Sequence, residues 1–307
     1  MAWSPTPVSP ALFSRRPDEP PADEPLSEES LSDGPLSEES LSEESLSDGP
    51  LTDGPLTGGT ANRGLVVRVG QTVRRPATPH RAATHALLAH LAAVGFDGAP
   101  RLLATDGTTD TLTYIEGRAA TEPLPEETLT EAALASIAGL LRRYHQAVAS
   151  FNPAGYCWPG PIPARYITGL VSHNDVYPAN IIFRGGRAVA LIDFDLAGPG
   201  GVCWDLAAAA RYWCPLRDER DVTDLRQGRA LSRFRLLLDA YGLAAAERTE
   251  VAGAIVANHD WDCATIAQGV QAGHAGFIDS WNENGGTMIR ARRWCQAHQR
   301  ALLAAAN

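Results

Sequence analysis

The sequence contains no lysine, so all 26 of its basic residues are arginines. This absence excludes catalysis through a lysine Schiff base. Any phosphate contact that other proteins make with lysine must come here from arginine, whose planar guanidinium can bridge two phosphate oxygens.

Cysteine pairs and long apolar runs are also missing. The five cysteines are widely scattered and form neither a CxxC motif nor a paired zinc-ligand spacing, which favours reduced thiols in a cytoplasmic protein. No stretch approaches the roughly 18 apolar residues needed to span a bilayer, and the proline-containing N-terminus lacks the apolar centre of a signal peptide. We therefore expect a cytoplasmic protein without membrane contact.

Acidic charge is concentrated at the start of the chain. Residues 1–57 carry 13 acidic and two basic side chains, so the remaining residues hold about +1 of a total charge of −10. Residues 23–57 form seven five-residue units, each with one leucine, which bury too little apolar surface to offset the entropy of ordering. We expect 1–57 to be a disordered acidic tail. No basic groove with interleaved aromatic residues indicates nucleic-acid binding.

The rest of the chain has the periodicities of a folded protein. The predicted elements of its first half are a hairpin over 64–75, a helix over 80–94, strands over 101–106 and 111–117, and a helix that starts at a Thr128–Glu131 capping box and runs to Val148. A second hairpin over 180–193 turns at Gly185–Gly186, and residues beyond about 203 have a helical pattern. This order predicts an α+β fold, with a small sheet and one helix followed by a mainly helical part.

The stretch SHNDVYPAN carries the strongest chemical signal. Asp175 precedes Asn180 by five residues, and pairing of the second hairpin brings Asn180 beside Asp193. Two carboxylates and an amide at one place would repel one another unless a cation lay among them, and hard oxygen ligands favour Mg²⁺. In this interpretation Asn180 and Asp193 hold the metal, and Asp175 accepts a proton from a hydroxyl nucleophile.

Several neighbouring polar residues have simpler structural interpretations. Asp195 serves either as a second metal contact or to fix its loop, and Asp205 begins a helical run and suits an N-cap. Acidic residues of the C-terminal helices, such as Asp262, face either a cationic substrate or solvent.

Taken together, these sequence motifs resemble those of a known family. The pattern H-x-D-x4-N-x12-D (His173, Asp175, Asn180 and Asp193), followed by ALIDFDLAGPG and WDLA, is similar to the aminoglycoside phosphotransferase family of small-molecule kinases. The resemblance implies a two-lobed, protein-kinase-like fold, with Asp175 as the catalytic residue. It also implies structural support from His173, whose ring bonds the backbone near Asp193, and from Asp205, which braces the catalytic loop.

The resemblance extends to a nucleotide-binding lobe over 58–116, followed by a catalytic and substrate lobe over 117–307. It implies that Gly58 and Gly59 cover the nucleotide phosphates and that Arg74 occupies the position usually held by lysine, with Arg75 as the next candidate.

The adenine would contact backbone groups of the hinge, Thr113, Tyr114 and Ile115. One feature departs from the family pattern: the helix over 80–94 lacks the glutamate that normally holds the basic residue, and offers only His85 and His90.

The leading hypothesis is an ATP- or GTP-dependent and Mg²⁺-dependent kinase that phosphorylates a hydroxyl of a small molecule, such as an aminoglycoside, another antibiotic, a sugar or an amino alcohol. The alternative is a catalytically inactive kinase-like protein that binds a nucleotide or a partner. A third hypothesis is a metal-dependent hydrolase with His173 and Asp175 as ligands.

Overall fold

The N-terminal sheet consists of short strands, rich in β-forming residues, that are joined by tight turns. The computed structural model describes residues 54–56 and 65–307. Its first sheet has the strand order β1-β2-β3-β5-β4, and every neighbouring pair is antiparallel. These strands are β1 (Gly54–Pro55), β2 (Val67–Val69), β3 (Thr72–Pro76), β4 (Leu102–Thr105) and β5 (Thr109–Thr113). The predicted hairpin over 64–75 is confirmed, and Gly70 makes its turn with a φ of 57°.

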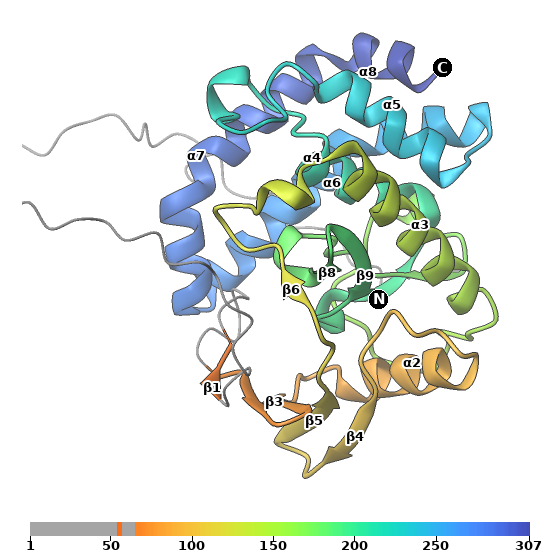
Figure 1. Ribbon diagram of the computed structural model, residues 1–307, viewed down its shortest axis with the longest axis vertical. Coiled ribbons are helices and arrows are strands. Elements are labelled where there is room, and N and C mark those ends of the chain that lie inside the picture. The colour runs from red at the N-terminus through yellow and green to blue at the C-terminus, as the bar shows by residue number, and fades with distance from the viewer. Residues whose placement is uncertain (1–53, 57–64) are drawn as a thin grey trace, which may run out of the picture. The chain divides into compact units, whose positions relative to one another are not determined.

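One helix accompanies this sheet. Helix α2 (Arg81–Ala93) buries Leu87, Leu88 and Leu91 on one face, which confirms the helix predicted over 80–94. The sheet and α2 lie below the helical part in Figure 1, with the second hairpin between them.

The second hairpin pairs β8 (Ile181–Arg184) with β9 (Arg187–Leu191), and β6 (Arg118–Ala119) lies on the other side of β8. Its turn glycines, Gly185 and Gly186, both have positive φ, as a two-residue hairpin turn requires. The hairpin is therefore confirmed, and its two ends meet where the Ile192 amide donates to the Asn180 carbonyl at 2.9 Å.

A pair of very short strands holds the segment that leads into the SHNDVYPAN stretch. Strand β7 (Leu170–Ser172) pairs with β10 (Gly198–Gly200). A Cβ on Gly200 would lie 2.2 Å from the Ser172 hydroxyl oxygen, so only glycine allows this close approach.

The remaining chain is mainly helical, as predicted. The helices are α3 (Glu131–Val148), α4 (Val202–Trp213), α5 (Ala230–Tyr241), α6 (Ala245–Gln271), α7 (Ala275–Ala297) and α8 (Gln299–Ala306). Short 3-10 turns cover Glu126–Thr128, Ala164–Tyr166, Pro178–Asn180, Phe194–Leu196 and Glu219–Asp221. Helix α3 packs on β9 and α5, while α4 packs on α6, and their apolar faces form one continuous core.

One local prediction is wrong. Helix α3 is capped by Thr130, whose hydroxyl accepts from the Ala133 amide at 3.0 Å. Thr128 lies in the preceding 3-10 turn and donates its hydroxyl proton to Pro125 O. The two threonines are two residues apart, and the helix begins after the second because its hydroxyl reaches the third helical amide.

The remaining predictions concern the cysteines, membrane-spanning helices, the N-terminal tail and the lobe boundary. The five cysteines are free thiols, as predicted. None of the helices formed by residues 65–307 is both long and apolar enough to cross a bilayer. The tail over 1–57, except for residues 54–56, and the glycines at 58 and 59 lie outside the described residues, and the lobe boundary at 116 stays a prediction.

Candidate active site

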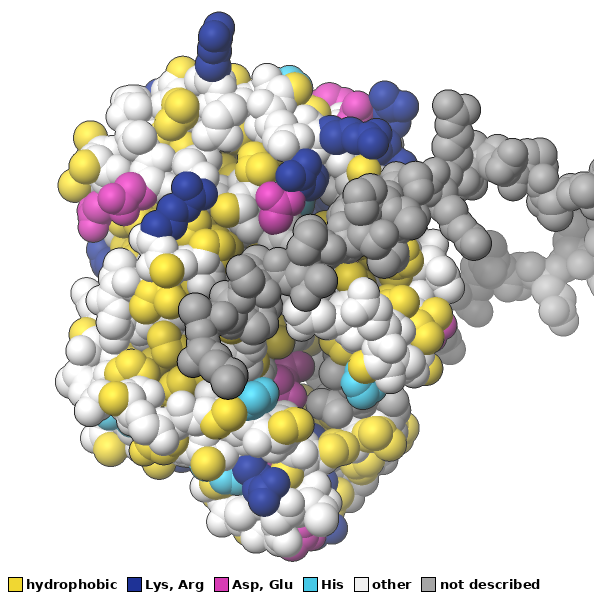
Figure 2. Space-filling view, turned by 180° about the vertical axis from the view of Figure 1, so that it is seen from behind, with side chains coloured by type: hydrophobic (Ala, Val, Ile, Leu, Met, Phe, Trp, Pro, Cys, Tyr) yellow, Lys and Arg dark blue, Asp and Glu magenta, His cyan; other side chains and the backbone are white. Residues whose placement is uncertain are grey.

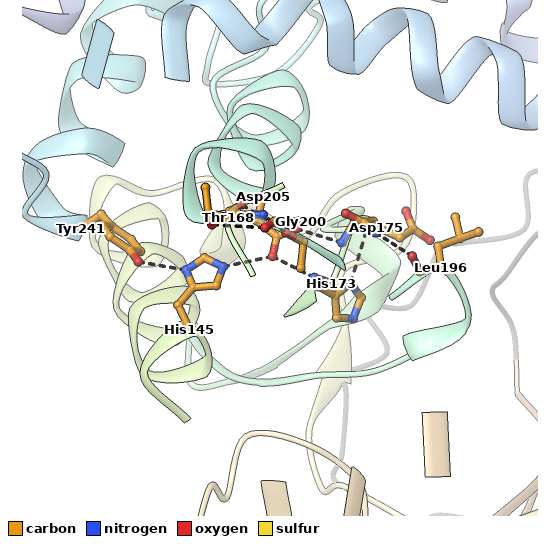
Figure 3. A network of polar contacts seen from close by, with 11 residues as sticks. His145, Thr168, His173, Asp175, Leu196, Gly200, Asp205 and Tyr241 are labelled. Atoms are coloured by element: carbon orange, nitrogen blue, oxygen red, sulfur yellow. Dashed lines mark hydrogen bonds and ion pairs between the residues drawn. The ribbon is translucent and has the colours of Figure 1, made fainter. Parts of the chain in front are cut away.

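The loop from β7 to β8 is anchored by a buried carboxylate. Asp205, on α4, accepts hydrogen bonds from the backbone amides of His173 and Asn174, each at 2.8 Å (Figure 3). Asp205 is not the N-cap of α4, because that position belongs to Gly201. These hydrogen bonds show that Asp205 braces the loop, as the family resemblance implies.

Two more side chains hold Asp205 in place. The Nε2 atom of His145, on α3, lies 3.0 Å from the Asp205 carboxylate, and its Nδ1 atom lies 2.9 Å from the Tyr241 hydroxyl on α5 (Figure 3). Three helices thus converge on one loop. Sequence reasoning missed His145, although a polar residue within the apolar stripe of a predicted helix is a usable signal.

The ring of His173 ties the loop to the end of the second hairpin. Its Nε2 atom donates to the Ile192 carbonyl at 3.0 Å, and its Nδ1 atom accepts from the Asp175 amide at 3.3 Å. Burial lowers the pKa of His173, which keeps the ring neutral and suits one donor and one acceptor nitrogen. The predicted bond to the backbone near Asp193 is confirmed.

Asp175 and Asn180 contact each other directly. The Asn180 amide nitrogen donates to the Asp175 carboxylate at 2.7 Å and to the Asp175 carbonyl at 3.1 Å. Burial first, and then the carboxylates of Asp193 and Asp262, raise the pKa of Asp175 to about 8, although the bond from Asn180 opposes the rise. The amide oxygen of Asn180 is left as the atom that can face a cation.

Asp193 lies at the far end of the hairpin in an unusual backbone conformation. Its φ is 61°, and Asn174 in the opposing loop has a φ of 66°. Both are left-handed conformations, which cost energy in residues other than glycine and occur preferentially at functional sites. They direct the two loops towards one cavity, which Asp175, Asn180 and Asp193 line together.

The basic residue at this site is Arg75, and the prediction of Arg74 is corrected. The Arg75 guanidinium lies 3.2 Å from Asp193 and 2.7 Å from Asp195, whereas Arg74 is exposed. Neighbouring residues of a strand point to opposite faces, so only one of the two arginines can face the site. Burial alone would lower the pKa of Arg75, but the carboxylates of Asp195 and Asp193 outweigh it and raise that pKa.

Asp195 belongs to the same cluster. Burial first, and then Asp193, raise the pKa of Asp195 to about 7, while Arg75 opposes both. Loop fixing and metal contact, the two interpretations of this residue, are both compatible with an ion pair of 2.7 Å to Arg75.

An acidic residue of the sheet, rather than of α2, lies next to Arg75. Asp110 on β5 is the register partner of Arg75, and its buried carboxylate lies 2.8 Å from the His85 ring of α2. The helix is thus linked to the sheet by histidine and aspartate in place of the missing glutamate. Sequence reasoning identified His85 but not Asp110.

Two of the backbone N–H groups in the predicted hinge are already hydrogen-bonded within the protein. The Thr113 amide already donates to the Arg101 carbonyl and the Tyr114 amide to the Gln71 carbonyl, each at 2.9 Å. Neither N–H group is available to an adenine, because the sheet uses both. The carbonyl groups of Thr113 and Tyr114, and the backbone of Ile115, stay predicted contacts of the adenine.

The site fits a nucleotide-bound cation better than a cation held by protein alone. Within residues 54–56 and 65–307 no three histidine, cysteine or acidic side chains form a metal cage. Mg²⁺ typically takes one or two carboxylates, with water and substrate phosphates as its other ligands. The amide of Asn180 and the carboxylate of Asp193 fit this smaller set, and a cation there would offset the burial and the like charges that raise the pKa of Asp175.

The cavity continues from these residues towards α6 and α7 and has a volume of about 380 Å³. Its far walls carry apolar and polar side chains from both helices, among them Ile266, Phe277, Ser280, Asn284 and Met288. This mixture suits a small organic molecule. On the face in Figure 2, the blue side chains of the described residues lie scattered rather than in a continuous band.

Comparison with known proteins connects this geometry with a family. Residues 157–238 match the phosphotransferase enzyme family. A relative from Rhizobium leguminosarum bv. trifolii, the trifolitoxin immunity protein, is 35% identical over 195 residues, which are 61% of this chain and 73% of the relative.

Solved structures show the same fold at lower identity. A choline/ethanolamine kinase family protein from Mesorhizobium loti has a TM-score of 0.56 and 17% identity, covering 84% of this chain and 92% of that one. The GDP complex of aminoglycoside 2'-phosphotransferase-IIIa has a TM-score of 0.53 and 13% identity, covering 80% and 94%. The fold is therefore kinase-like, and the chain belongs to the phosphotransferase enzyme family.

Proposed function

We propose that this protein transfers the terminal phosphoryl group of ATP or GTP to a hydroxyl of a small molecule, with Mg²⁺ on the nucleotide. The observation that carries the proposal is the convergence of Asp175, Asn180 and Asp193 on one cavity, with the Asn180 amide 2.7 Å from the Asp175 carboxylate. Family membership and the kinase-like fold support it.

Asp175 is the proposed catalytic residue. It orients the acceptor hydroxyl and takes its proton as the oxygen attacks phosphorus. Its pKa of about 8 is that of the protein without ligands, and a nearby cation favours the charged form of a carboxyl. Mg²⁺ bound near Asp175 would therefore favour its working, deprotonated state.

Asn180 and Asp193 are the proposed ligands of Mg²⁺, which when bound neutralises charge on the phosphates. Arg75 is positioned to share this task, because its guanidinium already pairs with Asp193 and Asp195, which line the cavity. Its planar fork can bridge two phosphate oxygens once these carboxylates turn to the metal.

The acceptor is proposed to bind between the catalytic loop and helices α6 and α7, where both apolar and polar side chains line the cavity. An aminoglycoside, another antibiotic, a sugar or an amino alcohol each offer the required hydroxyl. The relative named for trifolitoxin immunity adds a toxin to the acceptors worth testing.

The direct test is nucleotide turnover against a panel of these acceptors, with Asp175→Asn as the diagnostic variant. Loss of a general base should lower the rate by roughly 10²- to 10⁴-fold. Asp239→Asn, a change on the exposed side of α5, is the matched control and should leave turnover unchanged. Equal rates for wild type and Asp175→Asn would remove Asp175 from catalysis.

A nucleotide-binding protein without transferase activity is the second candidate. The ion pairs of Arg75 favour it, because they occupy both Asp193 and Asp195, while α2 offers no glutamate to draw the arginine away. Thermal shift measurements with MgATP and MgGTP separate the candidates: stabilisation without phosphoryl transfer to any acceptor supports the binding protein.

A further inference from the structure

Arg217 differs from the other arginines of the acceptor cavity because it forms no ion pair with any described residue. It lies in the loop after α4 and lines the cavity together with Arg211 and Arg226. Arg211 is paired with Asp262 at 2.5 Å, and Arg226 binds Asp224 through two nitrogens at 2.9 and 2.7 Å. Among the described residues, no side chain forms an ion pair or hydrogen bond with the Arg217 guanidinium, and its Nε atom is enclosed without a partner.

This arrangement is energetically unfavourable in the free protein. Burial lowers the pKa of Arg217, and the like charge of Arg226 lowers it further. A charged group that has lost water without gaining a partner destabilises a fold. Such a group is retained more readily where a ligand supplies the missing partner.

The acidic residues nearest to Arg217 do not supply that partner. Asp224 is bonded to Arg226, and Asp221 is bonded to Arg290 at 2.7 Å. Glu122 lines the cavity and interacts with Arg217 at longer range, but it is exposed and within the described chain makes no ion pair with it.

Tyr177 relates Arg217 to the catalytic loop. This partly exposed ring lies within electrostatic range of both Asp175 and Arg217. An acceptor lying along Tyr177 would therefore reach the catalytic carboxylate with one group and the guanidinium with another. The cavity volume of about 380 Å³ is sufficient for a molecule of this kind.

We propose that Arg217 binds a carboxylate of the acceptor, so that the acceptor is a small alcohol bearing a carboxyl group, such as a hydroxy acid or a hydroxyl-containing amino acid. The inference rests on the proposed function, since it concerns the acceptor of that same site. Arginine and carboxylate form paired, charge-assisted hydrogen bonds, which orient as well as hold a ligand.

The first test concerns the free protein and needs no activity. Arg217→Gln removes a half-buried charge that forms no ion pair with any described residue, so its Tm should equal or exceed that of the wild type. Arg220→Gln is the matched control, because Arg220 is 72% exposed and pairs with Asp218 outside the cavity. A clear fall in Tm for Arg217→Gln alone would show that the guanidinium supports the fold, and would overturn the proposal.

The second test compares probes that differ only by a carboxyl group. The pairs are L-homoserine with 3-amino-1-propanol, L-serine with ethanolamine, and glycerate with ethylene glycol. With MgADP present, at least one carboxylate probe should raise the wild-type Tm more than its counterpart does. In Arg217→Gln that difference should disappear, with affinity for the carboxylate probe reduced about 10-fold or more.

Two results would contradict the proposal. One is that no carboxylate probe stabilises the wild type more than its counterpart. The other is that Arg217→Gln loses stabilisation by MgADP itself, which would assign the guanidinium to the nucleotide. Because both readouts measure binding, selective binding without turnover would reject the proposed function while leaving the carboxylate subsite in place.

Discussion

Asp175 is a carboxyl group that the fold keeps at a cost to stability. It faces the cavity, is half-buried, and lies near the carboxylates of Asp193 and Asp262. Burial first, and these like charges second, raise its pKa to about 8 from an ordinary 3.8. A site that is unfavourable without ligands and favourable with a bound cation is a common arrangement in enzymes.

The pH dependence of stability follows from this shift. Because the pKa of Asp175 is higher in the folded state, the folded protein retains a proton that the unfolded chain has already lost, and stability falls as pH rises towards and through about 8. Asp195, with a pKa of about 7, acts in the same direction. Without metal or nucleotide, the wild-type Tm should decline from pH 6.5 to 8.5.

The variant Asp175→Asn isolates this contribution. It has no carboxyl group to ionise, so its Tm should decline less over the same range and exceed the wild-type Tm at pH 8.5. Differential scanning fluorimetry in a chelating buffer measures both curves. Parallel curves for the two proteins would mean that Asp175 titrates as an ordinary exposed aspartate.

Among secondary-structure elements, the helices hold the loop between β7 and β8 that carries Asp175. Asp205 of α4 binds two loop amides, and it is held in turn by His145 of α3, which contacts Tyr241 of α5. A buried carboxylate with this many donors is strongly fixed. The loop is therefore held rigidly by its hydrogen bonds to the helical core.

Replacing His145 tests this support. His145→Leu removes a buried donor from Asp205 and should lower the free energy of unfolding by about 1–3 kcal/mol, as expected when a buried polar group loses a partner. Tyr241→Phe removes only the outer contact and should cost less. Urea denaturation measures both, and an unchanged stability of His145→Leu would contradict the bracing network.

Sequence periodicity predicted most of these elements for identifiable reasons. The glycines at 185 and 186 and the apolar strands beside them specify the second hairpin, which in turn places Asn180 near Asp193. Strand β10 was not predicted, because its sequence Gly-Pro-Gly has no strand propensity of its own and pairs only where Ser172 lies close to Gly200.

The sequence could not decide between two neighbouring arginines as the basic residue of the site. Arg74 and Arg75 are chemically identical neighbours on one strand, and sequence cannot say which one faces the cavity. The structure decides through the ion pairs of Arg75 with Asp193 and Asp195.

At the scale of the whole molecule, the site unites residues that are distant in the sequence. Arg75 comes from the first sheet, Asp175 and Asp193 from the loops around the second hairpin, and Arg217 from the loop after α4. The acceptor side depends on how α6 and α7 pack, which no local pattern specifies. The proposed catalytic residues were therefore accessible from sequence, whereas the proposed acceptor cavity and Arg217 required the structure.

The most direct measurement of the central claim is a crystal structure of the full chain with Mn²⁺ and a non-hydrolysable ATP analogue. We predict an anomalous peak at roughly 2.1 Å from the Asn180 amide oxygen and an Asp193 carboxylate oxygen, with Arg75 turned to the phosphates and Asp175 facing the acceptor cavity. A metal bound away from both ligands, with Arg75 still paired to Asp193, would contradict the account.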